Sequence, residues 1–300
     1  MKTTLDEMQV FIAIVDSGSI TAAADVLGQT ISATSRTMSR LEEKLQTTLM
    51  RRTTRRLALT EEGKAYLEQA RRIIAAVEEA EELMNLRRNQ PAGLLRVDAA
   101  SPFMLHVIAP LVPAYRKRYP QVELELTSNE GNIDLLERRT DLAFRIGRLK
   151  DSSLHAVALG TSRVRVLASP GYLARHGTPR RAADLASHVL LGFAQLEPLN
   201  EWPLLDGDGQ PVHIKPQVRA HSGETLRQLA LNDGGIVCLS DFMTRGDRAS
   251  GALQPLFVKQ LLEVRQPINA VYYRNTAISS RIKSFIDFVV ETVGTRGFEE

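Results

Sequence analysis

Apolar positions near the start of the chain recur at helical spacing, and they are Leu5, Met8, Phe11, Ile12 and Val15. This periodicity predicts a first helix over about 5–16. Gly18 is a typical C-terminal stop and Ser19 a typical N-cap, so a second, Ala-rich helix is expected directly afterwards. Gly28 allows a turn into a third helix over about 31–45. The pattern therefore predicts three short helices, the last two forming a helix-turn-helix over about 20–39.

The third helix carries two kinds of residue on its two faces. Its inward positions are expected to be Ala33, Met38, Leu41 and Leu45. Small hydroxyl side chains on the outer face allow close approach to base edges, and Arg36 can reach a guanine edge or a phosphate, whereas Arg40 is better placed for the backbone. These residues predict a helix that binds in a DNA groove. The expected contacts on it are Ser32, Thr34, Ser35, Arg36 and Arg40.

A basic hairpin is predicted next, over 49–60. Two short extended pieces flank a polar tip, and four arginines lie within six residues, which exceeds what solubility requires. Such wings press on the sugar-phosphate backbone or enter the minor groove. An exposed hairpin that merely closes the domain is the alternative. The expected contacts are Arg51, Arg52, Thr53, Thr54 and Arg55. Arg52 is expected to contact a phosphate, so its removal should weaken binding to DNA of any sequence alike.

Charge supports a nucleic-acid partner only locally. The formal net charge of +3 says little, but 36–56 holds seven basic residues against two acidic ones. This cluster resembles the electrostatic footprint of a phosphate-binding surface. A solvated basic face is the alternative. The position of the cluster beside the helix-turn-helix makes this alternative weaker.

A long helix is predicted over 61–88, with an apolar stripe at heptad spacing formed by Tyr66, Ala70, Ile73, Val77, Ala80 and Met84. One narrow stripe needs a partner, and a second copy of the chain is the economical one. Packing on the chain's own C-terminal domain is the alternative. A hinge at 89–93 then sets the expected organisation: a winged helix-turn-helix domain at 1–60, a linker and dimerisation helix at 61–90, and a further domain at 91–300.

Strand and helix patterns alternate in the rest of the chain. Strands are expected near 94–100, 122–126, 141–147, 164–168, 236–239 and 268–273, with helices between them that include 132–139, 222–232 and 278–293, and a hairpin in 202–221. This alternation predicts parallel sheet and two α/β subdomains. Ligands gather at the carboxyl ends of such strands. The polar residues there form a candidate site for a small anion: Ser101, Pro102, Ser128, Asn129, Arg145, His221 and Ser222.

Each of these residues has an ordinary structural alternative. A serine at a strand-to-helix junction is at least as often a simple N-cap, and Arg145 could belong to a structural ion pair. Clustering of the set is what favours a site.

Other function classes lack their motifs. The six histidines show no metal-ligand spacing, and no nucleophile elbow, Walker loop or dinucleotide fingerprint is present, so no enzyme, metal or cofactor is expected. Cys238 is the single cysteine, which excludes an internal disulfide. No apolar run long enough for a membrane span and no signal segment is found, so a cytoplasmic protein is expected rather than an exported binding protein.

The order of these parts resembles the LysR-type transcriptional regulators. The matches run densely through the first sixty-odd residues and more loosely afterwards, and they include Phe11-Ile12-Ala13-Ile14-Val15, Ser17-Gly18-Ser19, Ala22-Ala23-Ala24, Leu27-Gly28, Ser35-Arg36, Arg40-Leu41-Glu42, Leu49, Arg52-Thr53-Thr54-Arg55 and Leu59-Thr60-Glu61-Glu62-Gly63. One departure is Ile31-Ser32, where many members place Gln-Pro. Base preference at that point therefore cannot be carried over.

The resemblance implies a function. The C-terminal domain would resemble periplasmic binding proteins, with a small-molecule effector between two subdomains, and Ser101 and Ser128 fall where the family places effector-contacting hydroxyls. Promoter DNA and the effector would be the partners of a homodimer or homotetramer. RNA polymerase would be a further partner of an activator.

Overall fold

A computed structural model describes residues 3–52, 57–86, 91–131, 135, 140–149, 154–195, 197–273, 279–293 and 298. At 52, 57, 78–86 and 197 only the backbone is described. The chain forms two compact units: an amino-terminal unit of residues 1–89 together with 275–279, and a carboxyl-terminal unit of residues 90–274 together with 280–300.

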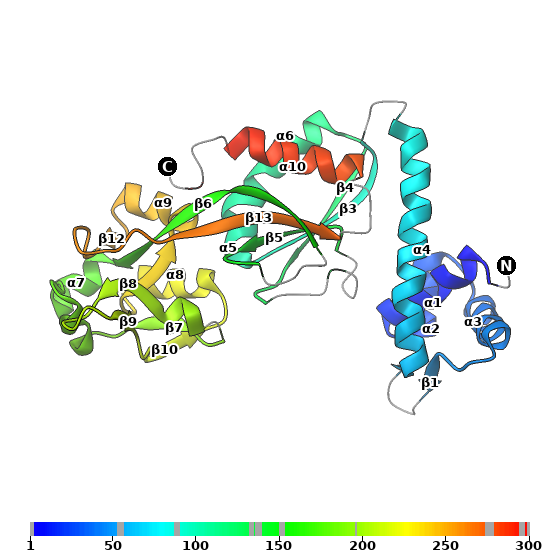
Figure 1. The fold of residues 1–300 in the computed structure, drawn as a ribbon, viewed down its shortest axis with the longest axis horizontal. Coiled ribbons are helices and arrows are strands. Elements are labelled where there is room, and N and C mark those ends of the chain that lie inside the picture. Colours follow the sequence, from blue (N-terminus) through cyan, green and yellow to red (C-terminus); the bar gives the residue numbers. More distant parts are fainter. Residues whose placement is uncertain are drawn as a thin grey trace. The chain divides into compact units, whose positions relative to one another are not determined.

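The amino-terminal unit is helical with a two-stranded wing (Figure 1). Its elements are α1 (Leu5–Ser17), α2 (Ile20–Leu27), α3 (Ile31–Leu45), β1 (Met50–Arg52), β2 (Leu57–Leu59) and α4 (Glu61–Leu86). Each helix follows a residue whose hydroxyl accepts a hydrogen bond from the backbone N–H three residues later, and these residues are Thr4, Ser19, Thr30 and Thr60. Such caps satisfy donors that the first turn leaves open. The predicted bounds of the third helix are confirmed.

The core of this unit lies between the first three helices and the start of α4. Phe11, Ile14 and Leu41 have no exposed surface. The Tyr66 ring lies 5.7 Å from that of Phe11, and Ala70 is fully buried. The first part of the apolar stripe on α4 therefore packs on its own domain. The prediction offered a second copy or the C-terminal domain as the partner of this stripe and did not include its own helical domain, although Ile73 remains 40% exposed.

The wing is fixed to the helices by hydrogen bonds between side chains and backbone. The Glu42 carboxylate accepts from the N–H groups of Leu49 (2.7 Å) and Met50 (3.1 Å), and β1 pairs antiparallel with β2. The Thr60 hydroxyl donates to the carbonyl of Thr48 at 2.8 Å. A Cβ at Gly63 would overlap the carbonyl oxygen of Leu49, so α4 approaches the wing as closely as glycine allows.

The carboxyl-terminal unit is α/β. Its strands are β3 (Gly93–Ala99), β4 (Val122–Ser128), β5 (Leu142–Ile146), β6 (Leu154–Ala168), β7 (Leu191–Phe193), β8 (Glu201–Leu205), β9 (Pro211–His213), β10 (Val218–Ala220), β11 (Val237–Ser240), β12 (Gln254–Pro255) and β13 (Arg265–Tyr273). Its helices are α5 (Ser101–Phe103), the π-helical η1 (Met104–Ile108), α6 (Ala109–Arg118), α7 (Pro170–His176), the 3₁₀-helical η2 (Ala182–Ser187) and η3 (Glu197–Asn200), α8 (Gly223–Leu231), α9 (Asp241–Ser250) and α10 (Ser280–Val293).

A seven-stranded mixed sheet runs through this unit in the order β11-β6-β13-β5-β3-β4, with β12 also paired to β6. β3 is parallel to β4 and β5, but β13 is antiparallel to both β5 and β6. The prediction of a parallel sheet is therefore wrong at its centre. The late strand returns in the opposite direction and enters the middle of the sheet, which no local pattern reveals.

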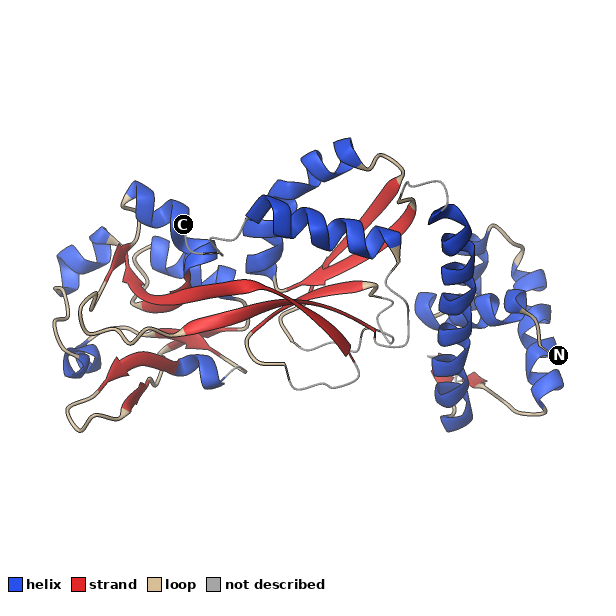
Figure 2. Ribbon diagram, turned by 45° about the horizontal axis from the view of Figure 1, so that its top comes forward, coloured by secondary structure: helices blue, strands red, loops and turns tan. Residues whose placement is uncertain are grey.

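Two subdomains share this sheet through β6 and β13 (Figure 2). β6 spans fifteen residues, far more than the predicted 164–168. Separate apolar cores lie on either side, one around Phe103, Phe144 and Phe285, the other around Tyr172 and Trp202. α6 and α10 lie together over the first subdomain, the one whose core holds Phe103 (Figure 1). The second subdomain is the one whose core holds Trp202. The predicted class, a winged helix-turn-helix with a two-subdomain α/β effector-type domain, is confirmed.

The individual elements predicted for the carboxyl-terminal unit agree with the structure in some places and not in others. β8 and β9 form the predicted hairpin around Asp206–Gly209. α9 had not been predicted. The helix predicted at 132–139 falls outside the described residues except for Leu135, which is buried.

Candidate functional site

The outer face of α3 carries the exposed residues of the predicted DNA-binding helix. Exposed side chains here are Ile31, Ser32, Arg36, Ser39 and Arg40. Ile31 is 52% exposed, which is unusual for a large apolar side chain, and it occupies the first position of the helix. Ser35 is half-buried. The face thus combines a cation, small hydroxyls and one apolar group at the end of the helix that recognition helices direct at base edges.

Thr34 does not belong to this face, contrary to prediction. It is fully buried, and its hydroxyl donates to the carbonyl of Thr30 at 3.2 Å. The helical period turns it away from the face of Ser32 and Arg36, because it lies two positions from both. Its side chain stabilises the turn rather than presenting a group to a ligand.

Behind the outer face lies an ion-pair network that sequence reasoning missed. The Glu7 carboxylate of α1, 2% exposed, contacts Lys44 Nζ at 2.7 Å and Arg40 Nε at 3.1 Å. Burial raises the pKa of Glu7, but hydrogen bonds from Lys44 and the Thr4 backbone, with the charges of Lys44 and Arg40, bring it below its ordinary value. The sequence did offer one signal for this network, because Glu7 is an acidic residue that lies within the apolar pattern of the first helix.

The wing is described in part. Arg51 on β1 is exposed, and Arg52 is placed by its backbone in the same strand. Thr53, Thr54 and Arg55 lie outside the described residues. Among the described side chains of the wing, Arg51 is thus an exposed cation.

In the carboxyl-terminal unit, a buried carboxylate organises the strand ends. Asp98, with no exposed surface, accepts hydrogen bonds from the Thr127 hydroxyl at 3.1 Å, from the Asn129 amide and from Arg145 Nη1 at 3.2 Å. Arg145 keeps 12% exposure, and its buried Nη2 has no partner among the described residues. Arg145 therefore belongs to an ion pair, the alternative weighed for it, and Asp98 was overlooked because it lies inside a strand.

Ser101 and Pro102 lie where the two subdomains meet. The Ser101 N–H donates to the Glu130 carboxylate at 3.2 Å, a place that a bound anion could have taken. Pro102 is buried, and a Cβ at Gly223 of α8 would lie 3.2 Å from its ring. Close by in the same helical stretch, His106 Nε2 lies 2.7 Å from Glu224 Oε2.

The remaining residues predicted for the effector site do not gather around one group. Ser128 and His221 are exposed, while Ser222 is half-buried and its hydroxyl caps α8 by accepting from the Glu224 N–H at 3.2 Å. The ordinary N-cap reading of Ser222 thus accounts for that hydroxyl. The structure brings Asn129 and Arg145 together through Asp98, whereas His221 and Ser222 lie on the segment that leads into α8.

Charges on the second subdomain's side of this junction are also paired internally. Arg227 donates to both oxygens of Asp247 at 2.6 Å and to Glu224 at 2.8 Å. Burial raises the pKa of Glu224, but hydrogen bonds from Gln228, His106 and Arg227 outweigh it and leave the pKa below its ordinary value. Glu224 is therefore a carboxylate that links His106 of one subdomain to Arg227 of the other.

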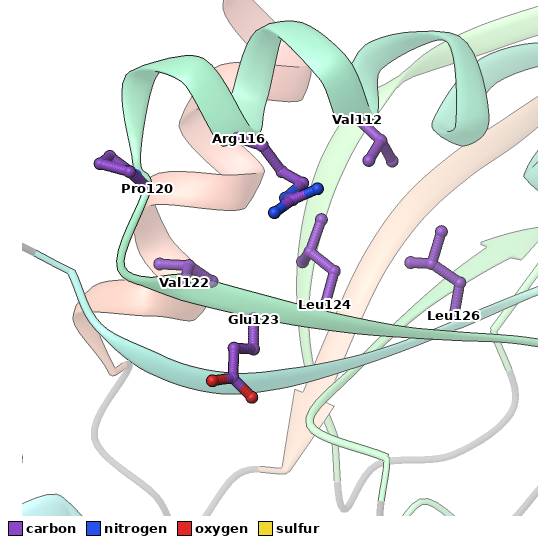
Figure 3. A pocket seen from close by; sticks show the side chains of 7 residues that line it. All are labelled: Val112, Arg116, Pro120, Val122, Glu123, Leu124 and Leu126. Atoms are coloured by element: carbon purple, nitrogen blue, oxygen red, sulfur yellow. The ribbon is translucent and has the colours of Figure 1, made fainter.

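A groove of about 380 Å³ lies elsewhere, between α6 and the edge strand β4 (Figure 3). Its lining residues are Val112, Arg116, Pro120, Val122, Glu123, Leu124 and Leu126. None of the predicted site residues is among them. Within the described ranges, no three His, Cys, Asp or Glu residues gather as a metal site, and no described helix is long and apolar enough to cross a membrane.

Comparison with known proteins matches both units. The family model for bacterial regulatory helix-turn-helix proteins of the LysR family matches residues 5–64, and that for the LysR substrate-binding domain matches residues 88–294. The chain is 48% identical over 294 residues to the transcriptional regulator CrgA of Neisseria meningitidis serogroup C, covering 98% of each chain. It is 32% identical to the transcriptional activator AaeR of Escherichia coli K12, covering 96% of this chain and 94% of that protein.

Solved structures agree. The structure of CrgA, described as a LysR-type transcriptional regulator from Neisseria meningitidis, matches with a TM-score of 0.67 at 47% identity, over 98% of this chain and 100% of the other. The full-length virulence activator AphB of Vibrio cholerae matches with a TM-score of 0.59 at 25% identity, over 96% and 99% of the two chains. With both domains matched in the expected order, the chain belongs to the LysR family of transcriptional regulators.

Proposed function

We propose that α3 and the wing bind promoter DNA, with α3 in the major groove. The observation that carries this is the outer face of α3, where Arg36 and the small hydroxyls are exposed around an unusually exposed Ile31. Arg36 would read a guanine edge, and Ser32 would let the helix approach closely. Arg40 and Arg51 would contact phosphates. Because its proposed target is promoter DNA, we also expect the protein in the cytoplasm.

Ile31 adds an apolar contact to the base recognition proposed for this helix. An aliphatic side chain at the start of a recognition helix has one favourable partner among base edges, the 5-methyl group of thymine. We therefore expect a thymine opposite Ile31 in each half-site.

Arg36 and Arg51 provide the test of this division of roles. Arg36→Ala should cost about 1–3 kcal/mol at one base pair and relax the preference there, because a bidentate base contact is lost. Arg51→Ala should weaken all sequences alike and reduce the salt slope by about 1. Binding would be measured by fluorescence anisotropy on duplexes selected by the wild-type chain from a random library. Identical behaviour of the two variants would contradict the proposal.

The carboxyl-terminal unit is proposed to bind a small effector where the two subdomains meet, near Ser101, Asn129 and Arg145, with Ser128, His221 and Ser222 at the rim. The cation expected to attract an anion is already paired with Asp98, and Glu130 occupies the Ser101 N–H. Recognition should therefore rest on hydrogen bonds and shape more than on net charge. Footprinting with and without compounds from a screen of anions and neutral polar molecules tests this. An unchanged footprint across both sets would count against it.

Two or four copies are proposed to assemble, partly through α4, and an activator would also contact RNA polymerase. The exposed Ile73 on α4 supports a contact between copies, since Ala70 before it on the stripe is already buried in its own domain and Val77 after it is only half-buried. Ile73→Glu should shift the mass measured by light scattering towards the monomer. An unchanged mass would assign assembly to other surfaces.

A further inference from the structure

Glu7 is a buried carboxylate on α1 that holds two cations of α3. Its Oε1 lies 2.7 Å from Lys44 Nζ and 3.1 Å from Arg40 Nε, and its Oε2 accepts from Lys44 Nζ and from the Thr4 N–H, each at 3.0 Å. With 2% exposure, it is nearly inaccessible to water. A carboxylate in this position keeps its charge only because these donors surround it.

Arg40 is constrained by this arrangement at one edge only. Its Nε lies 3.1 Å from Glu7 Oε1 as an ion pair, and its Nη2 donates to the Thr37 hydroxyl at 3.4 Å, yet the side chain is 58% exposed. A guanidinium is planar, so contacts at Nε and Nη2, which lie on one edge, restrict its orientation. Arg40 shares a face of α3 with Arg36 and Ser32, because they lie four and eight positions away, and its exposed part can meet a phosphate there.

We propose that Glu7 is a positioning residue for DNA recognition, which presets the Arg40 guanidinium for a phosphate and withholds Lys44 from the DNA. This rests on the proposed function, in which Arg40 contacts the backbone. A phosphate contact carries no base information, but it fixes the register of the helix in the groove, so that Arg36 and Ile31 meet their bases. Glu7 therefore acts on sequence preference without touching DNA.

Two effects of removing the Glu7 charge have opposite signs. Loss of a negative charge near phosphates strengthens binding to any sequence, and a released Lys44 adds a sequence-independent contact. Loss of the preset guanidinium weakens the correctly registered complex, by about fivefold, because a long side chain must then be ordered on binding. The ratio of specific to non-specific affinity should fall, while the salt slope should rise by about 1.

A purely bracing role for Glu7 makes different predictions. If Glu7 only ties α1 to α3, its removal lowers the melting temperature and leaves the ratio of affinities among folded molecules unchanged. The ratio is thus the measurement that separates positioning from bracing.

The experiment compares Glu7→Gln, Arg40→Ala and the double variant in the full chain. Each is titrated against a duplex selected by the wild-type chain from a random library and against a shuffled duplex of equal length, at several salt concentrations. Glu43→Gln is the matched control, since it removes an equal charge from an exposed position of α3. Arg40→Lys is a second test that leaves the buried carboxylate intact and keeps the charge, but lacks the planar fork.

We expect Glu7→Gln and Arg40→Lys each to lower the affinity ratio by about fivefold. Glu43→Gln should leave the ratio within about twofold of wild type, because its charge acts on all sequences alike. In the Arg40→Ala background, Glu7→Gln should lower the ratio no further.

Four outcomes overturn the inference. An unchanged ratio in folded Glu7→Gln leaves only the bracing role. An unchanged ratio in Arg40→Lys excludes the preset guanidinium, even if Glu7→Gln does not fold. Additive effects in the double variant show that Glu7 does not act through Arg40, while the proposed function stands. No effect of Arg40→Ala on either duplex removes Arg40 from the DNA-binding set, and the inference fails with that part of the proposed function.

Discussion

The outer face of α3 and the junction between the two subdomains use similar residues in opposite ways. On α3, Arg36 and Arg40 are exposed and one buried carboxylate, Glu7, stands behind them. At the junction, Arg145 is paired with the buried Asp98, and Arg227 with Asp247 and Glu224. One region leaves its positive charge for an outside partner, and the other neutralises it internally.

The difference shows that a cation in the sequence does not by itself predict an anionic ligand. Long-range attraction to phosphate requires unneutralised charge at the surface. A paired guanidinium inside a domain instead fixes the strand ends and presents polar groups of defined geometry. The two regions should therefore respond differently to substitution and to pH.

Gly63→Ala should produce the largest effect, confined to the DNA-binding side of the comparison. The new Cβ would overlap the Leu49 carbonyl, a backbone atom that cannot move cheaply. We expect the amino-terminal unit to lose more than about 3 kcal/mol and DNA binding to fail. Calorimetry should show the transition of the carboxyl-terminal unit unchanged. Gly207→Ala, with open space around it, is the control, and equal damage by both variants would contradict the assignment.

Asp98→Asn should break the other side. It leaves the partly buried Arg145 without its counter-charge, which we expect to cost the carboxyl-terminal unit about 3 kcal/mol. Urea unfolding measures this. The control is Glu125→Gln, because it breaks an exposed pair with Arg96 and should cost less than about 1 kcal/mol. Similar losses in the two variants would show that Asp98 is not the centre of its network.

Ile31→Ala sharpens the account of the α3 face. Losing an aliphatic contact with a thymine methyl should cost about 1 kcal/mol on the selected duplex. Replacing thymines by deoxyuridine, one position at a time, should weaken the wild type at one position per half-site and leave Ile31→Ala unaffected there. A wild-type chain indifferent to every replacement would exclude methyl recognition.

Acidification should separate the stabilities of the two units by a smaller margin. Burial, followed by the charge of His176, lowers the pKa of His188 below 6.5. The unfolded chain therefore takes up this proton first, so stability is complete above pH 6.5 and declines as pH falls below it. The pKa of Glu7 lies below 4.5, so its contribution is present above that value and is lost only at lower pH.

Thermal unfolding from pH 7.5 to 5 checks this difference. The carboxyl-terminal transition should fall, and His188→Gln should flatten the dependence, whereas His213→Gln, at an exposed position, should not. A larger fall in the amino-terminal transition would reverse the assignment.

The sequence predicted best where structure is set by neighbouring residues. Ser19 and Gly28 fix the ends of α2, so that helix was predicted from its cap and stop residues, and the turn at Gly28 placed the start of α3. Thr34 was misjudged because a hydroxyl on a recognition helix suits either a groove or a buried turn. Glu7 was overlooked because its partners lie 33 and 37 positions away, on another helix.

The carboxyl-terminal unit shows the limit of local patterns more plainly. Strands near Leu94, Val122, Leu142 and Ile268 were anticipated, but not that β13 lies between β5 and β6. Sheet order depends on pairings between distant segments, which hydrophobic alternation does not encode. The same limit explains the site, since Ser101 and Arg145 were anticipated while the charges that pair with their groups, Glu130 and Asp98, were not.

The central position of β13 has a consequence for how the chain is made. The helices of the amino-terminal unit begin at caps supplied by adjacent residues, so that unit can fold once α4 has left the ribosome. The large sheet of the other unit lacks its middle strand until Tyr273 has been synthesised. At about 5–20 residues per second, the interval is about 10–40 s. During translation, the nascent chain can therefore hold a finished DNA-binding domain while its regulatory domain is still incomplete.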